Sequence, residues 1–219
     1  MAADPAPPVL FDIDDTLLDT GRFFRQVLWP LLSGLLDISL GELDDSARLY
    51  FDRLSSPSDF HPLELLAHLA TIYQIELDRL REVVFVPDNV ERCRFEDVLP
   101  AMDQLAGSTR LGIYSEGVRQ DWQQFKLESL GVMDWLQPDL IFIEMRKLRP
   151  EVVAQLPPGV LIVDDKRSVV TTLARSGRVQ PVLIDRSRGG GAPTAEQPAV
   201  PVITTLAELP ELIARLHHQ

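Results

Sequence analysis

Over most of the chain, short apolar runs alternate with stretches whose apolar residues recur at helical spacing. The runs predict strands at 8–13, 110–114, 140–143, 160–163 and 182–184. The helical spacing predicts helices at 98–106, 118–130, 151–156, 168–176 and 206–216. Strands that alternate with helices in this way are typical of parallel βαβ units. We therefore expect an α/β fold whose core is a doubly wound, Rossmann-like, mostly parallel sheet.

Residues 19–96 interrupt this alternation. Helical spacing recurs there in 22–36, 43–54, 63–73 and 77–84, with turn signals at 55–58 and 87–89. No convincing strand pattern of period two occurs between them. We therefore expect two domains, namely an α/β core formed by 1–18 and 97–219 and an inserted helical domain, 19–96.

The composition and charge of the chain mainly argue against certain classes of function and location. The 219 residues include 21 Lys and Arg against 33 Asp and Glu, a formal net charge of −12. So acidic a chain is poorly suited to nucleic acid or to an anionic membrane surface, both of which need clustered basic residues. A single cysteine cannot form an internal disulfide, residues 1–8 lack the features of a signal peptide, and no apolar run is long enough to span a membrane. We expect a cytoplasmic protein, and the sequence does not indicate its oligomeric state.

Polar residues follow four of the predicted strands directly. The carboxyl ends of parallel strands meet at one edge of a sheet, where ligands of doubly wound folds bind. Any one of these groups alone is more simply explained as a solvated loop, but together they indicate a polar ligand site. The residues are Asp12, Asp14, Asp15 and Thr16; Ser115, Glu116 and Gly117; Glu144, Arg146 and Lys147; and Asp164, Asp165 and Lys166.

The carboxylates at this edge indicate a metal ion. Asp12 and Asp14 lie two residues apart at a strand end, and two carboxylates about 5 Å apart repel each other by roughly 3 kcal/mol at an effective dielectric near 20. A cation, or a proton on one of them, must offset this repulsion. Asp164 and Asp165 add two more oxygen donors, and such a set favours Mg²⁺. A purely structural carboxylate cluster is the alternative.

A cation in an acidic cleft suggests a small phosphorylated substrate. Lys147 can supply positive charge, while the Ser115 hydroxyl and the amides of Glu116 and Gly117 can supply hydrogen bonds. An aspartate can then attack phosphorus, and a neighbouring acid can protonate the leaving oxygen and later activate water.

The segment Phe11-Asp-Ile-Asp-Asp-Thr-Leu17 resembles the first motif, D-x-D-x-T, of the haloacid dehalogenase (HAD)-like hydrolases. The other three signatures of that superfamily follow in order. They are Ser115 at a strand end, Lys147 followed by Arg149-Pro150, and the pair Asp164-Asp165. The resemblance covers the chain from about Val9 to Ile184.

The resemblance implies a role for each matching residue. Asp12 would be the nucleophile and Asp14 the general acid/base, while Ser115 and Lys147 would hold phosphate. Mg²⁺ would be held by Asp12, by the backbone carbonyl of Asp14, and by Asp164 and Asp165, with Asp165 favoured as the direct ligand. The helical insertion would be the cap that selects the substrate.

Some residues depart from the pattern or compete for a role. Glu116 stands where related enzymes often have Asn, so its carboxylate either faces away, contacts the cap or binds a cationic group of the substrate. Arg146 and Arg149 are alternatives to Lys147, and Lys126 is a weaker one that we expect on a solvated helix face.

Other residues that could carry chemistry are better explained by structure. His61 and His68 lack a third metal ligand, Cys93 should be buried and inert, and the tryptophans Trp29, Trp122 and Trp135 should be packing residues. Arg22, Phe23 and Phe24 are weaker candidates for substrate contacts. The segment 188–193, which contains three glycines, is expected to be a surface loop.

We therefore predict a Mg²⁺-dependent phosphatase, a phosphoric monoester hydrolase that acts on a small phosphorylated metabolite through an aspartyl phosphate at Asp12. A phosphomutase and a non-catalytic binding or regulatory protein of the same fold are the alternatives. Dehalogenase chemistry is disfavoured because it needs neither Mg²⁺ nor an acid/base at Asp14.

Overall fold

The computed structural model describes residues 7–56, 59–117, 119–186 and 200–217. The predicted loop at 188–193 lies outside the described residues. The chain forms two compact units, the first made of Met1–Leu17, Phe95–Glu116 and Val132–Gln219, and the second of Leu18–Arg94 and Gly117–Gly131. The second unit therefore contains a helix, Gln120–Ser129, that lies within the range 97–219 assigned to the core from the sequence.

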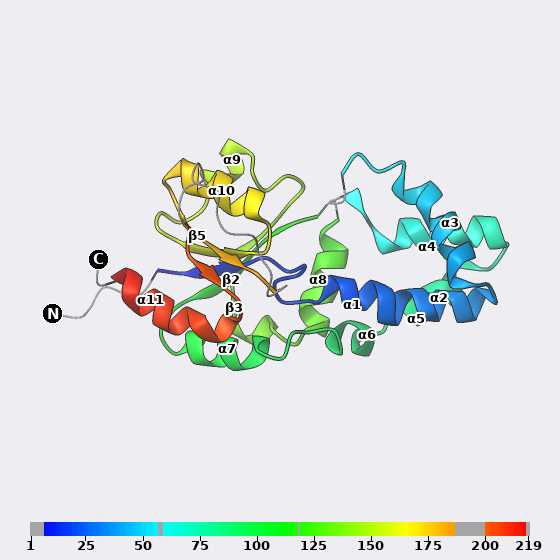
Figure 1. Cartoon of the computed structure of the whole chain (residues 1–219), viewed down its shortest axis with the longest axis horizontal. Coiled ribbons are helices and arrows are strands. Elements are labelled where there is room, and N and C mark those ends of the chain that lie inside the picture. The colour runs from blue at the N-terminus through cyan, green and yellow to red at the C-terminus, as the bar shows by residue number, and fades with distance from the viewer. Residues whose placement is uncertain (1–6, 57–58, 118, 187–199, 218–219) are drawn as a thin grey trace. The chain divides into compact units, whose positions relative to one another are not determined.

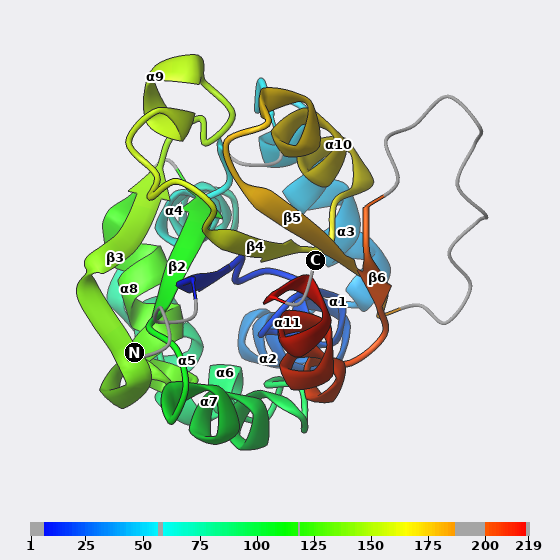
Figure 2. The same ribbon diagram turned by 90° about the vertical axis from the view of Figure 1, so that its left-hand side faces the viewer.

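The first unit is built on a six-stranded sheet in which every neighbouring pair is parallel (Figure 2). The strand order is β3-β2-β1-β4-β5-β6, which confirms the predicted doubly wound core. The last strand was not predicted, because two residues give no readable apolar run. The strands are β1 Val9–Phe11, β2 Leu111–Glu116, β3 Leu136–Glu144, β4 Leu161–Asp164, β5 Gln180–Ile184 and β6 Val202–Ile203.

Helices cover both faces of this sheet, with α9 and α10 on one face and α7 and α11 on the other (Figure 2). Their bounds are α7 Val98–Ala106, α9 Pro150–Val153, α10 Arg167–Ser176 and α11 Leu209–His217, with 3₁₀ turns at Met133–Trp135 and Leu206–Glu208. Apolar side chains of β1, β2 and β4 pack with those of α9 and α10 in one buried cluster, which includes Leu10, Tyr114, Ile162, Val153 and Leu173. This burial stabilises the packing of the sheet against α9 and α10.

The strand β3 is longer than the predicted run 140–143 because its pairing with β2 is irregular. Leu111 pairs with Leu136, but Ile113 pairs with Ile141, so β3 carries extra residues at this point. Gly112 permits the close approach, since a Cβ atom there would lie 2.3 Å from the backbone oxygen of Leu140.

The second unit is helical in its described part (Figure 1). Ser39 and Glu42 form a capping box at the start of α3, and Pro62 occupies the first turn of α4. The predicted turn at 87–89 is wrong, because Pro87 instead begins the short helix α6. The helices are α1 Thr20–Arg22, continued by a π-helical segment Phe23–Leu28, α2 Trp29–Leu36, α3 Leu40–Phe51, α4 Pro62–Tyr73, α5 Leu77–Val84, α6 Pro87–Glu91 and α8 Gln120–Ser129.

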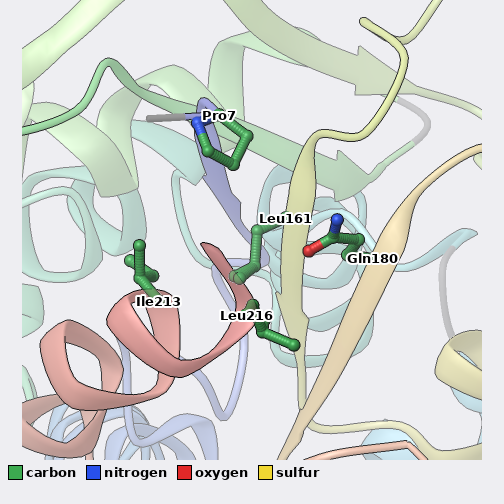
Figure 3. Close-up of a pocket in the computed structure, with 5 residues that line it drawn as sticks. All are labelled: Pro7, Leu161, Gln180, Ile213 and Leu216. Atoms are coloured by element: carbon green, nitrogen blue, oxygen red, sulfur yellow. The ribbon is translucent and has the colours of Figure 1, made fainter. Parts of the chain in front are cut away.

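No helix in the described ranges combines the length and the apolar character that crossing a membrane requires. A small pocket lies at the amino-terminal ends of β4 and β5, lined by Pro7, Leu161, Gln180, Ile213 and Leu216 (Figure 3). This is the sheet edge opposite to the predicted ligand site.

A polar network joins distant parts of the first unit. Asp97, just before α7, accepts hydrogen bonds at one oxygen from Arg186 (2.6 Å), from the Thr205 hydroxyl (2.6 Å) and from the Leu206 amide (2.7 Å). Arg186 also donates to the backbone oxygen of Thr16 at 2.6 Å and lies over the Phe95 ring. Burial alone would raise the pKa of Asp97, but the donors outweigh it and hold that pKa below its usual value. The network thus fixes the loop that follows β1.

Asp97→Asn removes the charge that these three donors share. We expect the free energy of unfolding, measured by urea denaturation at pH 7, to fall by about 2–4 kcal/mol. Because the native pKa of Asp97 is lowered, its contribution is complete above about pH 5 and is lost as the pH falls through the native pKa. The difference between wild type and variant should therefore narrow on acidification. Asp103→Asn, exposed on the same helix, should change stability by less than about 0.5 kcal/mol. The role given to the Asp97 charge would be contradicted if Asp103→Asn lost as much unfolding free energy as Asp97→Asn. It would also be contradicted if the stability difference between wild type and Asp97→Asn stayed the same at low pH.

Candidate active site

The register of the sheet brings the predicted residues to one edge. Phe11 of β1 pairs with Ile113 of β2 and with Val163 of β4, so the residues that follow these three positions lie side by side. The backbone amide of Asp12 donates to Val163 at 2.9 Å, which continues the pairing one residue beyond β1. The predicted strand-end positions are therefore neighbours in the fold.

Lys147 lies at the centre of this edge. It is only 1% exposed, and its Nζ is 3.0 Å from Asp12 Oδ1 and 2.5 Å from Asp164 Oδ2. The turn between β3 and α9 carries it, and the buried Tyr114 hydroxyl donates to its backbone oxygen. The Tyr114 ring also lies 5.7 Å from Nζ. Contacts thus fix the position of Lys147 both at its backbone oxygen and at its ammonium group.

The alternatives to Lys147 have other positions. Arg149 is exposed, and Arg146 forms an ion pair with Glu116. Lys126 belongs to α8 in the second unit and is 2% exposed, with Nζ 5.7 Å from the centre of the Trp122 ring. The expectation of a solvated Lys126 is therefore wrong. The spacing of apolar residues in α8 did not indicate that this helix also buries polar side chains such as Lys126.

Charge and burial oppose each other in this cluster. Burial disfavours the Lys147 ammonium, but the carboxylates of Asp12 and Asp164 outweigh that effect and raise its pKa above the ordinary value. Asp165, in contrast, forms no ion pair with a cation of the described residues. Burial, followed by the negative charges of Asp12 and Asp164, raises the pKa of Asp165 to about 7. One ammonium therefore faces three carboxyl groups.

These three carboxyl groups could hold a metal ion. Asp12, Asp164 and Asp165 each offer one oxygen, and these oxygens lie within 4.8 Å of one another. One oxygen of Asp164 accepts from Lys147, and the other accepts from the Lys166 amide at 2.8 Å. In contrast, Asp165 Oδ1 is buried and accepts no hydrogen bond from the described residues. An all-oxygen set with an unsatisfied buried atom fits a hard divalent cation.

Asp14 is half-buried and is not one of these three carboxylates. It lies in the tight turn that follows Asp12. The next residue, Asp15, has a φ of 55°, a left-handed conformation that Asp tolerates better than most residues do. Thr16 is fully buried, and its hydroxyl has no hydrogen-bond partner among the described residues. The carbonyl of Thr16 is the one held by Arg186.

Ser115 and Glu116 end β2. Ser115 is 1% exposed, and it pairs with Ile143 of β3 in the register of the sheet. Glu116 pairs in the same register with Glu144, and its carboxylate is 3.6 Å from Arg146 Nη1. The strand thus brings the predicted phosphate-binding serine to the same edge as Asp12.

Histidine and cysteine serve structural purposes in the described part. Nδ1 of the buried His61 accepts the Leu63 amide and caps α4, while Nε2 is 3.2 Å from Asp121. His68 Nε2 lies 3.0 Å from the Ser46 carbonyl. Cys93 is buried, as expected, and burial raises the pKa of its thiol.

The aromatic residues mostly pack as expected. Trp122 is buried and stacks on Phe125, whereas Trp29 and Trp135 are half-buried. Among the weaker candidates for substrate contacts, Phe23 is 2% exposed and forms an edge-to-face pair with Phe24.

Two residues of the site escaped the sequence reasoning. Tyr114 lies within a predicted apolar strand, and nothing in the pattern indicates where its hydroxyl points. Arg186 follows β5, and it would have been found by extending the strand-end rule to the fifth predicted strand.

Comparison with solved structures finds the same fold in several proteins. A HAD phosphatase from Thermococcus onnurineus matches with a TM-score of 0.65 at 23% identity, over 94% of this chain and 97% of that one. The HAD-hydrolase YfnB from Bacillus subtilis, bound to magnesium, matches with a TM-score of 0.66 at 15% identity, over 96% and 99%. An L-2-haloacid dehalogenase from Xanthobacter autotrophicus, with chloropropionic acid covalently bound, matches with a TM-score of 0.57 at 18% identity, over 95% and 98%.

No protein-family model matches the sequence, and a search of curated proteins finds no relative. Identities this low establish the fold and leave the reaction open, since the matching structures include both a phosphatase and a dehalogenase.

Lys147→Met leaves Asp12 and Asp164 buried without their cation. We expect the free energy of unfolding, measured by urea denaturation without metal, to fall by about 3–5 kcal/mol. Arg175→Met, at an exposed position of α10, should change it by less than about 0.5 kcal/mol. A Lys147→Met variant as stable as wild type would show that the ion pairs do not stabilise the fold.

Proposed function

We propose that this chain, which has the fold of the haloacid dehalogenase-like hydrolases, is a Mg²⁺-dependent phosphatase that acts on a small phosphorylated metabolite. The observation that carries the proposal is the cluster of Asp12, Asp164 and Asp165 around Lys147 at the carboxyl edge of the sheet. A phosphate dianion needs cations to approach a nucleophilic carboxylate, and this edge offers one ammonium and a site for a divalent ion.

Lys147 and Ser115 bind the phosphoryl group in this proposal. The Lys147 ammonium is kept charged by its two carboxylate partners, so it remains a cation over the whole physiological pH range. Its contact with Asp12 also places positive charge beside the nucleophile. Ser115, at the end of the neighbouring strand, supplies a hydroxyl, and the amides of Glu116 and Gly117 supply further donors.

Asp12 acts as the nucleophile. One of its oxygens attacks phosphorus as the bond from phosphorus to the leaving oxygen breaks, and Asp14 gives its proton to that oxygen. Asp14 then takes a proton from water, whose oxygen attacks phosphorus. The bond from Asp12 to phosphorus breaks, and inorganic phosphate leaves with Asp12 regenerated.

Asp12, Asp164 and Asp165 would hold Mg²⁺, together with the backbone carbonyl of Asp14. The bound ion supplies positive charge that neutralises the phosphoryl oxygens. Asp165 is the better candidate for a direct ligand, because both Asp164 oxygens already accept hydrogen bonds whereas Asp165 Oδ1 accepts none from the described residues.

Three expectations from the sequence accompany this proposal. The helical insertion 19–96 would select the substrate as a cap, the protein would work in the cytoplasm, and it would bind neither nucleic acid nor membranes. The helical pattern of 19–96 supports the first, the single cysteine supports the second, and the acidic composition supports the third.

Phosphate release from p-nitrophenyl phosphate and a panel of phosphorylated metabolites tests the activity. We expect turnover with Mg²⁺, none with EDTA, and a loss of about 10³-fold or more in Asp12→Asn, because the nucleophile is removed. Asp103→Asn is the folded control. Turnover that EDTA or Asp12→Asn leaves intact would contradict the proposal.

Further assays on the same purified protein distinguish the phosphatase from a mutase, a dehalogenase and a non-catalytic protein. Activation by a bisphosphate, with return of the phosphoryl group to the substrate, would indicate a mutase. Halide release from a 2-haloacid without metal would indicate a dehalogenase. Ligand binding without any turnover would indicate a binding or regulatory protein.

Magnesium titration by calorimetry tests the metal ligands. Asp165→Asn should weaken Mg²⁺ binding by about tenfold or more while stability without metal is retained. Asp164→Asn should lower both the affinity and the stability, because it also disrupts the contact with Lys147. Glu151→Gln, exposed on α9, should change neither. Equal Mg²⁺ affinity in wild type and Asp165→Asn would exclude Asp165 as a ligand.

A further inference from the structure

Glu116 and Arg146 form an ion pair at the active edge of the sheet. Glu116 ends β2 directly after Ser115, and Arg146 directly precedes Lys147 in the turn after β3. Arg146 Nη1 is 3.6 Å from Glu116 Oε1 and also donates to the Met145 carbonyl at 2.8 Å. Both side chains are partly buried, with 18% of Glu116 and 34% of Arg146 exposed. The pair therefore adjoins, in the chain, both residues that would hold phosphate.

A carboxylate at position 116 works against anion binding. The site already has three carboxyl groups, from Asp12, Asp164 and Asp165, and Lys147 forms ion pairs with the first two of them. Glu116 adds a negative charge one residue from Ser115. Its register partner, Glu144, adds another at the end of the neighbouring strand.

The charge of Glu116 reaches the centre of the site. Burial is the main cause that raises the pKa of the Tyr114 hydroxyl; the Lys147 ammonium opposes this rise, and the charges of Asp164, Glu144 and, least of all, Glu116 add to it. That hydroxyl is the group that donates to the Lys147 backbone. A dianion bound between Lys147 and Ser115 would therefore be repelled by Glu116 unless a cation compensates for it.

We propose that Arg146 is a positioning residue that cancels the charge of Glu116, so that a phosphate dianion can bind at Ser115 and Lys147. The inference rests on the proposed phosphatase function, since it concerns the same site. It explains how this chain accommodates a carboxylate beside the phosphate-binding serine. Arg146 acts through Glu116, and the phosphate itself is held by Lys147, Ser115 and the metal site.

This mechanism predicts a specific pattern in a double-mutant cycle. If Arg146 acts only by compensating for Glu116, its removal should be harmful while Glu116 is present and harmless once Glu116 is neutral. If Arg146 instead contacts phosphate directly, its removal should be equally harmful in both backgrounds.

The experiment measures the Kd of inorganic phosphate for the full chain by calorimetry in the presence of Mg²⁺. Inorganic phosphate is not hydrolysed, so the measurement reports binding without turnover. Arg146→Gln should weaken phosphate binding by about tenfold or more. Glu116→Gln should leave it unchanged or tighten it, and the double variant should return to within about threefold of wild type. The difference in phosphate Kd between Arg146→Gln and wild type should become smaller at high salt, because salt screens the repulsion between the anion and the partly exposed Glu116. Arg175→Gln, exposed on α10, controls for the loss of one positive charge, and thermal unfolding confirms that each variant is folded.

If the wild type binds phosphate, either of two results would overturn this inference and leave the proposed function standing. A double variant as weak as Arg146→Gln would show that Arg146 itself binds the anion. Weaker binding in Glu116→Gln would show that Glu116 instead orients a group that the anion needs. Wild type that neither binds phosphate nor releases it from the substrate panel would overturn the proposed function, and this inference with it.

Discussion

A buried ammonium between two buried carboxylates is the interaction on which the rest of the first unit depends. Lys147, Asp12 and Asp164 are each at most 2% exposed, and none of them could keep its charge there alone. They come from three separate segments, namely the ends of β1 and β4 and the turn after β3. Their mutual attraction therefore favours the one arrangement of strands in which all three meet. The same contacts bring three carboxyl groups together, and they leave Asp165 without an ion pair to any of the described residues.

The surrounding packing makes this arrangement rigid. The Tyr114 hydroxyl holds the Lys147 backbone, while its ring belongs to the apolar cluster beneath α9 and α10. Arg186 connects the carbonyl of Thr16 to Asp97, and so it fixes the turn that carries Asp14. Apolar burial and polar bonds thus act on the same few residues. Such support allows a turn with an unfavourable backbone angle at Asp15 to persist.

The sequence was sufficient for five of the six strands and for the set of strand-end residues, because both follow from periodicity and from the geometry of parallel strands. It could not indicate which basic residue near position 147 turns inward, since Arg146, Lys147 and Arg149 share one short turn. Nor could it predict the burial of Lys126, which depends on which face of α8 is covered. The helix at Pro87 was missed because proline and asparagine serve turns and first helical turns equally well. The failures at Lys126 and in the turn around Lys147 concern tertiary contacts, whereas the one at Pro87 is an ambiguity of the local sequence.

The central position of β1 has a consequence for how the chain reaches its native state. This strand precedes both of its partners in the chain, which begin at Leu111 and Leu161, so it cannot complete its pairing until both of them have been synthesised. The contact between Arg186 and Thr16 spans 170 residues. Folding of the first unit therefore depends on non-local contacts, which slow it and leave the backbone N–H and C=O groups at both edges of β1 unpaired during translation. The helical unit, whose segment Leu18–Arg94 is continuous, has no such delay over that segment and can gain structure while β1 still awaits its neighbours.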